Sequence, residues 1–153
     1  MECVESVATC KESSGIDYEI IIIDDGSNDS TFELATDLAN RFSFIKVFHQ
    51  PNVGSAASRN RGIQIANGKY LFFVDSDDFV DSKEIFNDLN ENMFYEFDAI
   101  RGGYRSLSKK KNFLPQENQD LNKILTFEAK SQIFWEMGFW RFIYNREFIS
   151  KNN

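Results

Sequence analysis

Two apolar runs that each end in a cluster of aspartates constrain the fold of this chain more than any other feature. Residues 20–23 are four consecutive isoleucines followed by Asp24-Asp25, and residues 70–74 (YLFFV) are followed by Asp75-Ser76-Asp77-Asp78. Apolar runs of this length without polar alternation indicate strands that are buried on both faces, as in a parallel sheet. We therefore expect an α/β domain in which helices flank a mostly parallel sheet.

The segment after the first aspartate cluster predicts an amphipathic helix. Ser30 and Glu33 have the spacing of a capping box, in which the serine caps the helix N-terminus. Leu34, Leu38 and Phe42 then recur at intervals of four residues, so they are expected to share the buried face of the helix.

A second helix is predicted to follow a strand at residues 44–48. Ser55 is its expected N-cap, and Asn67-Gly68 its expected end, where glycine permits a left-handed C′ residue. The same rules predict the remaining elements, which are helices at residues 2–12 and from Ser82, a strand at 98–104 with the flexible pair Gly102-Gly103, and a loop at 106–120.

Length and charge limit the classes of function. The chain has 153 residues, 17 basic and 24 acidic side chains and a formal net charge of −7. This length fits one domain, residues 1–153. Because a phosphate backbone is bound by clustered Lys and Arg, we expect no nucleic-acid partner. The basic run Lys109-Lys110-Lys111 is interpreted as part of a solvated loop.

The sequence also predicts a location. Cys3 and Cys10 lie seven residues apart, which on a helix is too far for a disulfide, and the chain has neither an apolar stretch of eighteen residues nor the pattern of a signal peptide. We expect a soluble cytoplasmic protein, and peripheral association with the inner face of the membrane is left open.

The aspartate clusters are expected to lie close together, because the carboxyl ends of parallel strands meet at one edge of a sheet. In an extended segment, Asp75 and Asp77 can reach a shared point, and their hard oxygen atoms suit Mn²⁺ or Mg²⁺. Arg59 lies about one turn into the predicted helix, where the helix N-terminus and a guanidinium group together favour phosphate. The alternative is structural, since turns favour aspartate and helix surfaces often carry arginine.

Three other features are interpreted as structural. His49 follows a strand without metal-ligand spacing, so it is expected to be structural or exposed. Arg61 is expected to be an ordinary surface charge of the helix. The aromatic residues after Leu125 are expected to pack in the core.

Three segments together resemble the family 2 glycosyltransferases of GT-A fold. They are residues 19–31 (EIIIIDDGSNDST), 52–62 (NVGSAASRNRG) and 66–79 (ANGKYLFFVDSDDF), in the family's order and with family-like spacing. Residues 2–7 are similar to the end of the family's first helix, and residues 140–148 (WRFIYNREF) to a late strand and helix. The resemblance covers nearly all of the chain and implies a Rossmann-like GT-A fold.

The resemblance also implies roles for particular residues. Asp24 or Asp25 would hydrogen-bond the nucleotide base, usually uracil, and Arg59 would lie near the diphosphate. Asp75-Ser76-Asp77 is similar to the family's DXD motif, with Asp77 as a ligand of Mn²⁺ or Mg²⁺ and Asp75 contacting the ribose or the metal shell. The implied reaction is inverting transfer of a sugar from a nucleotide donor, such as a UDP-sugar, to a hydroxyl of a glycan or lipid-linked acceptor in polysaccharide biosynthesis.

Two family features are absent from this sequence. Family members open with a buried strand in the middle of the sheet, and here Met1 falls where the first helix should be ending. Without it, its two neighbouring strands would have unpaired backbone N–H and C=O groups. We expect either that these two strands pair with each other or that another segment takes the place between them. The family's catalytic base would come just after Asn153, so none is assigned, and residues 106–153 would form only part of the acceptor side. We expect a chain cut short at both ends that transfers poorly alone.

Two other functions are weighed against this one. The chain is alternatively a noncatalytic remnant or an association subunit, in which exposed sheet edges and the aromatic tail form an interface, including one between copies of the chain. A nucleotidyl or phosphoryl transferase would need a phosphate-binding glycine loop after its first strand, and the sequence has none.

Overall fold

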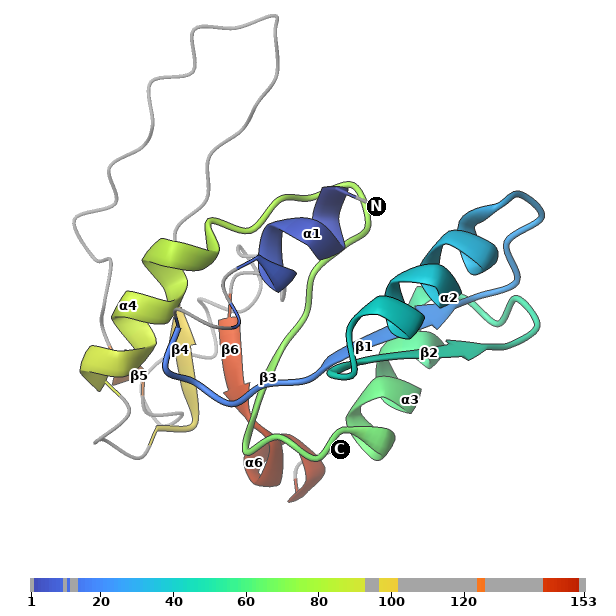
Figure 1. Ribbon diagram of the computed structural model, residues 1–153. Helices are drawn as coiled ribbons and strands as arrows, with labels where there is room; N and C mark the ends of the chain where they lie inside the picture. Colours follow the sequence, from blue (N-terminus) through green and yellow to red (C-terminus); the bar gives the residue numbers. More distant parts are fainter. Residues whose placement is uncertain are drawn as a thin grey trace, which may run out of the picture.

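Helices and strands alternate from α1 to β4 (Figure 1). The computed structural model of the protein describes residues 2–9, 11, 14–92, 97–101, 124–125 and 142–151. The elements, in chain order, are α1 (Glu2–Ala8), β1 (Ile20–Asp24), α2 (Thr31–Arg41), β2 (Ile45–His49), α3 (Ser55–Ile65), β3 (Tyr70–Phe72), α4 (Ser82–Asn92), β4 (Ala99–Arg101), β5 (Ile124–Leu125), β6 (Phe142–Asn145) and α6 (Arg146–Lys151). This order confirms the predicted α/β class.

Several predicted features lie outside the described residues. They are the pair Gly102-Gly103, the loop at 106–120 with its three lysines, Cys10, and the aromatic residues from Phe127 to Trp140. Among the described helices, none is long and apolar enough to cross a membrane.

The parallel pair β1–β2 carries helices on both of its faces. Its register aligns Ile20 with Ile45. Ile20 and Ile22 belong to an apolar cluster with residues of α1 and α2. A Cβ atom on Gly62 of α3 would lie 3.5 Å from Cδ1 of Ile23, so α3 covers the opposite face. The isoleucine run therefore alternates between two covered faces, as predicted.

A second sheet has the order β3-β6-β4-β5, and each pair of neighbours in it is antiparallel. Because β6 lies between them in the opposite direction, β3 and β4 run the same way. Phe142 and Tyr144 of β6 are buried with Ala99, and Phe73 and Ile149 pack against them. The strand and helix predicted near residues 140–148 are confirmed as β6 and α6, and core packing is confirmed for these two aromatic residues.

The two sheets are not joined by hydrogen bonds between β1 and β3 in the described part of the chain. The isoleucines of β1 are consequently only half-buried, and Phe72 of β3 is 38% exposed. In the described residues β1 and β3 do not pair with each other, so the predicted closing up of the two neighbouring strands is not observed. No described segment takes the place of the family's first strand.

The predicted start of α2 is right in position and wrong in mechanism. Ser30 is the N-cap residue, but its side chain makes no capping hydrogen bond. The carboxylate of Asp29 instead accepts a hydrogen bond of 3.0 Å from the N–H of Thr31. A charged acceptor one residue earlier thus replaces the serine hydroxyl.

Both ends of α3 also differ from the prediction. Gly54, with φ 88°, is the N-cap in place of Ser55. Gly68 is not among the described glycines with positive φ, because Ala66 ends the helix in an extended conformation. The N–H of Asn67 then donates to the Glu19 carboxylate at 2.7 Å. The N–H of Ala66 donates to the carbonyl of Gly62, so α3 ends without a glycine cap.

Leu38 and Leu34 provide a matched test of the packing of α2. Both were predicted to be buried, but Leu38 is 3% exposed and Leu34 is 48% exposed. Leu38→Ala should lower the free energy of unfolding by about 2–5 kcal/mol, because it leaves a cavity in the core. Leu34→Ala, the same change in the same helix, should cost less than about 1 kcal/mol. Urea unfolding followed by circular dichroism measures both, and equal losses would contradict this packing.

Candidate functional site

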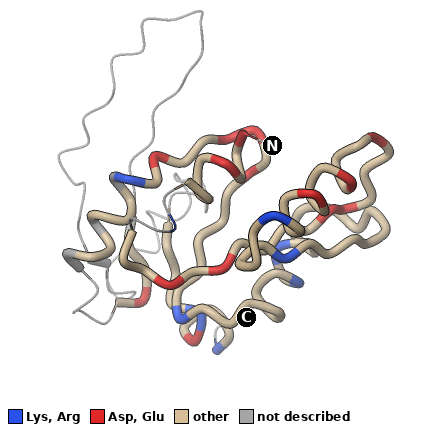
Figure 2. Tube along the Cα trace, viewed as in Figure 1, with Lys and Arg blue, Asp and Glu red and all other residues tan. Residues whose placement is uncertain are grey.

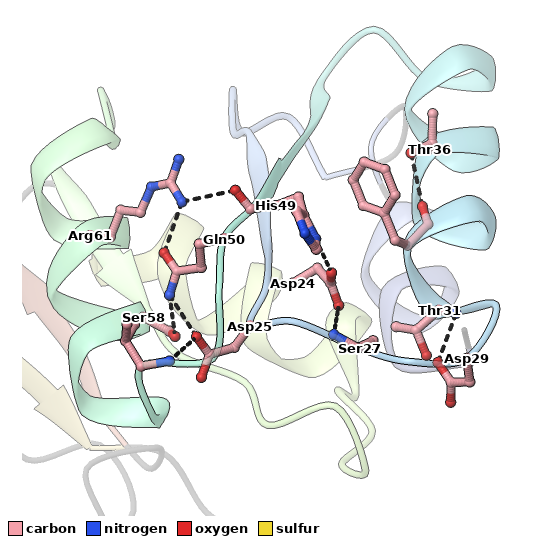
Figure 3. A network of polar contacts seen from close by, with 12 residues as sticks. Asp24, Asp25, Ser27, Asp29, Thr31, Thr36, His49, Gln50, Ser58 and Arg61 are labelled. Atoms are coloured by element: carbon pink, nitrogen blue, oxygen red, sulfur yellow. Dashed lines mark hydrogen bonds and ion pairs between the residues drawn. The ribbon is translucent and has the colours of Figure 1, made fainter.

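The carboxyl end of β1 carries two aspartates whose side chains have different surroundings (Figure 3). The Asp24 side chain is 1% exposed, accepts a hydrogen bond from the N–H of Ser27 at 3.3 Å and contacts Nδ1 of His49 at 2.6 Å. Hydrogen bonding by Ser27 lowers the pKa of Asp24 below its ordinary value, although burial acts the other way, and His49 adds to the lowering. His49 is thus half-exposed and has a structural contact, and the sequence predicted a structural or exposed histidine.

Asp25 accepts three hydrogen bonds from the loop that leads into α3. Its Oδ1 accepts from Nε2 of Gln50 at 2.8 Å and from the N–H of Val53 at 3.0 Å, and its Oδ2 accepts from the N–H of Gly54 at 2.8 Å. These hydrogen bonds lower the pKa of Asp25, and the bond from Gln50 has the largest effect. The carboxylate therefore fixes the loop and the start of α3.

Gly26 permits this loop to approach β1 closely. Its φ is 80°, and a Cβ atom there would lie 2.8 Å from the backbone nitrogen of Asn52. A side chain at this position would push the loop away from the strand end.

Gln50 completes the network, and sequence analysis did not identify it. It is buried, its Nε2 also donates to Oγ of Ser58 at 2.9 Å, and its Oε1 accepts from Arg61 at 2.8 Å. Arg61 donates further to the carbonyl of His49 at 3.2 Å, so it is a structural residue and not an ordinary surface charge. The position of Gln50 directly after β2 is the sequence signal that marks it.

The second aspartate cluster lies in a turn after β3. The N–H of Asp78 donates to the carbonyl of Asp75 at 3.0 Å, so these residues form a turn and not the extended segment that was predicted. Oδ1 of Asp75 accepts from Arg59 at 2.8 Å, in a pair whose side chains are 29% and 39% exposed for arginine and aspartate. Asp77 is exposed.

The N-terminal part of α3 is where the two clusters meet. Gly54 contacts Asp25 from β1, and Arg59 contacts Asp75 from the end of β3. Asp24 does not take part, because its side chain is buried and contacts His49 and Ser27 instead. Figure 2 shows the acidic residues after β3 beside those of α1, and Sγ of Cys3 in α1 lies 3.5 Å from the carbonyl of Asp75. Within the described residues, no three His, Cys, Asp or Glu side chains are arranged to hold a metal.

The comparisons with known proteins identify the family. The model of "Glycosyl transferase family 2" matches residues 2–150. This chain belongs to that family. Its domain is accordingly that of a transferase enzyme.

Curated relatives support this assignment. The chain is 33% identical over 163 aligned residues to the "Uncharacterized glycosyltransferase EpsJ" of Bacillus subtilis, with 99% of this chain and 45% of that protein covered. It is 36% identical over 153 to the "Cholesterol galactosyltransferase" of Borreliella burgdorferi, with 90% and 42% covered. The chain thus spans less than half the length of these relatives.

A solved structure confirms the GT-A-like fold. The crystal structure of S. aureus TarS 1-349 matches with a TM-score of 0.75 and 22% identity, covering 99% of this chain and 44% of that one. The same protein in complex with UDP matches with a TM-score of 0.73 and 21% identity, covering the same shares.

Asp24→Asn should lower stability in a pH-dependent way. The folded-state pKa of Asp24 is lowered, so its ionised form stabilises the protein above the unfolded pKa, and this stabilisation is lost as the pH falls through the folded value. At pH 7 we expect a loss of about 1–3 kcal/mol, because a buried charged acceptor is removed. The difference from wild type should shrink steadily below about pH 4.

Urea unfolding between pH 2 and 7 measures this difference. Asp37→Asn is the control, because Asp37 is exposed on α2, and its curve should run parallel to that of the wild type. A loss for Asp24→Asn that is constant across the pH range would show that the charge of Asp24 contributes nothing.

Proposed function

We propose that the N-terminal part of α3 binds the nucleoside diphosphate of a UDP-sugar, and that the protein transfers the sugar with inversion to a hydroxyl of a glycan or lipid-linked acceptor. The observation that carries the proposal is the convergence of Asp25, Arg59 and Asp75 on this helix end, with Asp77 in the adjoining turn. The UDP complex of TarS, which shares the fold, supports the choice of donor. We place the reaction in polysaccharide biosynthesis, in the cytoplasm at the inner face of the membrane.

Asp25 is the better candidate of the two aspartates for contact with the base. Its Oδ2 accepts one hydrogen bond from the protein, and a carboxylate oxygen has room for a second. A base N–H can therefore bind without displacing the loop. Asp24 is too deeply buried for this role.

Arg59 is placed to contact the diphosphate. Its guanidinium extends from the first turns of α3, where the helix dipole also favours an anion. Because it pairs with Asp75, we propose that the phosphate groups replace Asp75 as its partner. This exchange releases the Asp75 carboxylate at the moment the donor binds.

Asp75 and Asp77 would hold the divalent cation. Two carboxylates from one turn supply hard oxygen ligands for Mn²⁺ or Mg²⁺ and leave coordination positions for water and phosphate oxygens, which fits the two-residue set seen here. When bound, such a cation offsets negative charge on the leaving diphosphate. No described residue is assigned as the base that deprotonates the acceptor.

The alternative is a noncatalytic remnant or an association subunit with the same fold. The observation in its favour is the pair of unjoined sheet edges at β1 and β3, which leaves apolar side chains partly exposed. This alternative predicts no metal-dependent nucleotide binding.

Asp77→Ala tests the cation site directly. Titration calorimetry of UDP against the wild type should show binding with Mn²⁺ and weak or no binding without it. Asp77→Ala should weaken the Mn²⁺-dependent binding by about tenfold or more, because one of two carboxylate ligands is lost. Asp37→Ala removes the same charge from the exposed surface of α2 and should bind as the wild type does. If the wild type shows no metal-dependent binding, the remnant hypothesis gains and the proposal is withdrawn.

Arg59→Ala separates the diphosphate contact from the base contact. The variant should lose most of the preference for UDP over UMP, by about tenfold, because the outer phosphate loses a charged donor. UMP, which shares the base but lacks the outer phosphate, should bind the variant with nearly the wild-type affinity. Competition titrations with the two nucleotides measure the ratio. An unchanged ratio for Arg59→Ala would place the diphosphate elsewhere.

A further inference from the structure

The side-chain amide of Gln50 has only one orientation that satisfies all of its neighbours (Figure 3). Its Oε1 accepts from Arg61 at 2.8 Å, and its Nε2 donates to Oδ1 of Asp25 at 2.8 Å and to Oγ of Ser58 at 2.9 Å. A flipped amide would direct its oxygen at the Asp25 carboxylate and its N–H groups at Arg61. Gln50 is therefore held as a hydrogen-bond donor toward Asp25.

The hydroxyl of Ser58 fixes this orientation a second time. It donates to the carbonyl of Gly54 at 3.1 Å, so it acts toward Gln50 as an acceptor. Gln50 is also only 8% exposed, and its backbone N–H donates to the carbonyl of Asp24 in β1 at 3.0 Å. The main chain and the side chain of Gln50 are thus both fixed.

The two carboxylate oxygens of Asp25 are used unequally. Oδ1 accepts from Gln50 and from the N–H of Val53, whereas Oδ2 accepts from the N–H of Gly54 alone among the residues that the structure places. A carboxylate oxygen accepts about two hydrogen bonds, so Oδ1 is filled and Oδ2 keeps one position open. Gln50 therefore determines which oxygen of Asp25 remains open.

The positive charge of Arg61 acts on Asp25 through Gln50. The partners that the structure describes for Asp25 are neutral N–H groups, and Arg61 donates to Gln50 and to the carbonyl of His49. A charged donor on Oε1 polarises the amide and strengthens the donors on Nε2. An arginine placed directly on Asp25 would instead compete with a ligand for the carboxylate. The amide thus supports the negative charge of Asp25 and leaves Oδ2 open.

We propose that Gln50 is a positioning residue for the base of the nucleotide donor, because it holds the carboxylate of Asp25 with Oδ2 open toward a base N–H. The inference rests on the proposed function, in which Asp25 contacts the base. The ligand that fits this acceptor presents a ring N–H, as uracil does at its N3 position. Gln50 is buried and acts through Asp25.

UDP and N3-methyl-UDP separate the positioning of Asp25 from general support of the fold. In titration calorimetry with Mn²⁺, the wild type should bind UDP about tenfold or more tightly than N3-methyl-UDP, which lacks the base N–H. Gln50→Leu, which has no donor for Asp25, should weaken UDP by about fivefold or more and leave the affinity for N3-methyl-UDP nearly unchanged. Gln64→Leu, the same change at an exposed position of α3, should bind both nucleotides as the wild type does.

Gln50→Glu is a second variant, and it keeps the shape of the side chain. Its carboxylate retains an acceptor for Arg61, so the fold should persist, and a circular dichroism spectrum like that of the wild type checks this. At about pH 8 the variant places a second carboxylate and no donor beside Asp25. It should therefore show the same selective loss of UDP affinity as Gln50→Leu.

Two outcomes would overturn the inference and leave the base contact standing. One is equal weakening of UDP and N3-methyl-UDP in the Gln50 variants, which would show a structural role alone. The other is a UDP affinity in both variants equal to that of the wild type. If the wild type itself binds the two nucleotides equally, the base contact of Asp25 is wrong, and the inference fails with it.

Discussion

The carboxylate of Asp25 joins three parts of this structure at one point. It accepts hydrogen bonds from Gln50, Val53 and Gly54, and so joins the end of β1 to the loop after β2 and to the first residue of α3. The position of α3 follows from this contact. Because Arg59 of α3 contacts Asp75, Asp25 also influences the position of the turn after β3, through α3.

The position of α3 explains why side chains that follow β1 and β3, two strands that are not paired with each other, meet at its N-terminal part. α3 starts beside the carboxyl ends of β1 and β3 and ends near Glu19, at their amino ends. Gly62 in its middle faces Ile23 of β1, whose Cδ1 would lie 3.5 Å from a Cβ atom at this position. The helix thus contacts both β1 and the turn after β3, although no strand pairing joins the two sheets in the described chain.

The sequence predicted those features that depend on local patterns. The isoleucine run and its aspartates marked a buried parallel strand, and β1 has that environment with alternate residues under α1, α2 and α3. The extent of its burial was not predictable, because burial depends on a neighbour that the run itself does not specify. The helix ends were misplaced for a related reason. Asp29 accepts from the N–H group that Ser30 was expected to bind, and Ala66 ends α3 before Gly68 is reached. The N–H of Asn67 then donates to Glu19, a contact across 48 residues.

The candidate site shows the same division between local and long-range information. Its acidic and basic residues were identifiable because charged side chains at strand ends and a helix start are visible in the sequence. Gln50 was not, since its importance comes from three partners that are distant in sequence or on another element. The different roles of Asp24 and Asp25 were equally hidden. Adjacent residues at a strand end point to opposite sides, and only the packed structure shows which side is buried.

Electrostatics connects the acidic composition to the proposed chemistry. Near the start of α3 lie the carboxylates of Asp25, Asp75 and Asp77 and the guanidinium of Arg59, which is already paired with Asp75. A diphosphate entering this region would meet more negative than positive charge. Binding is then favourable only if a cation enters with it, because a divalent ion between two carboxylates and the phosphates reverses the sign of the local field. The proposed exchange of Arg59 from Asp75 to phosphate acts in the same direction, since the phosphates gain the guanidinium while Asp75 becomes available to the cation.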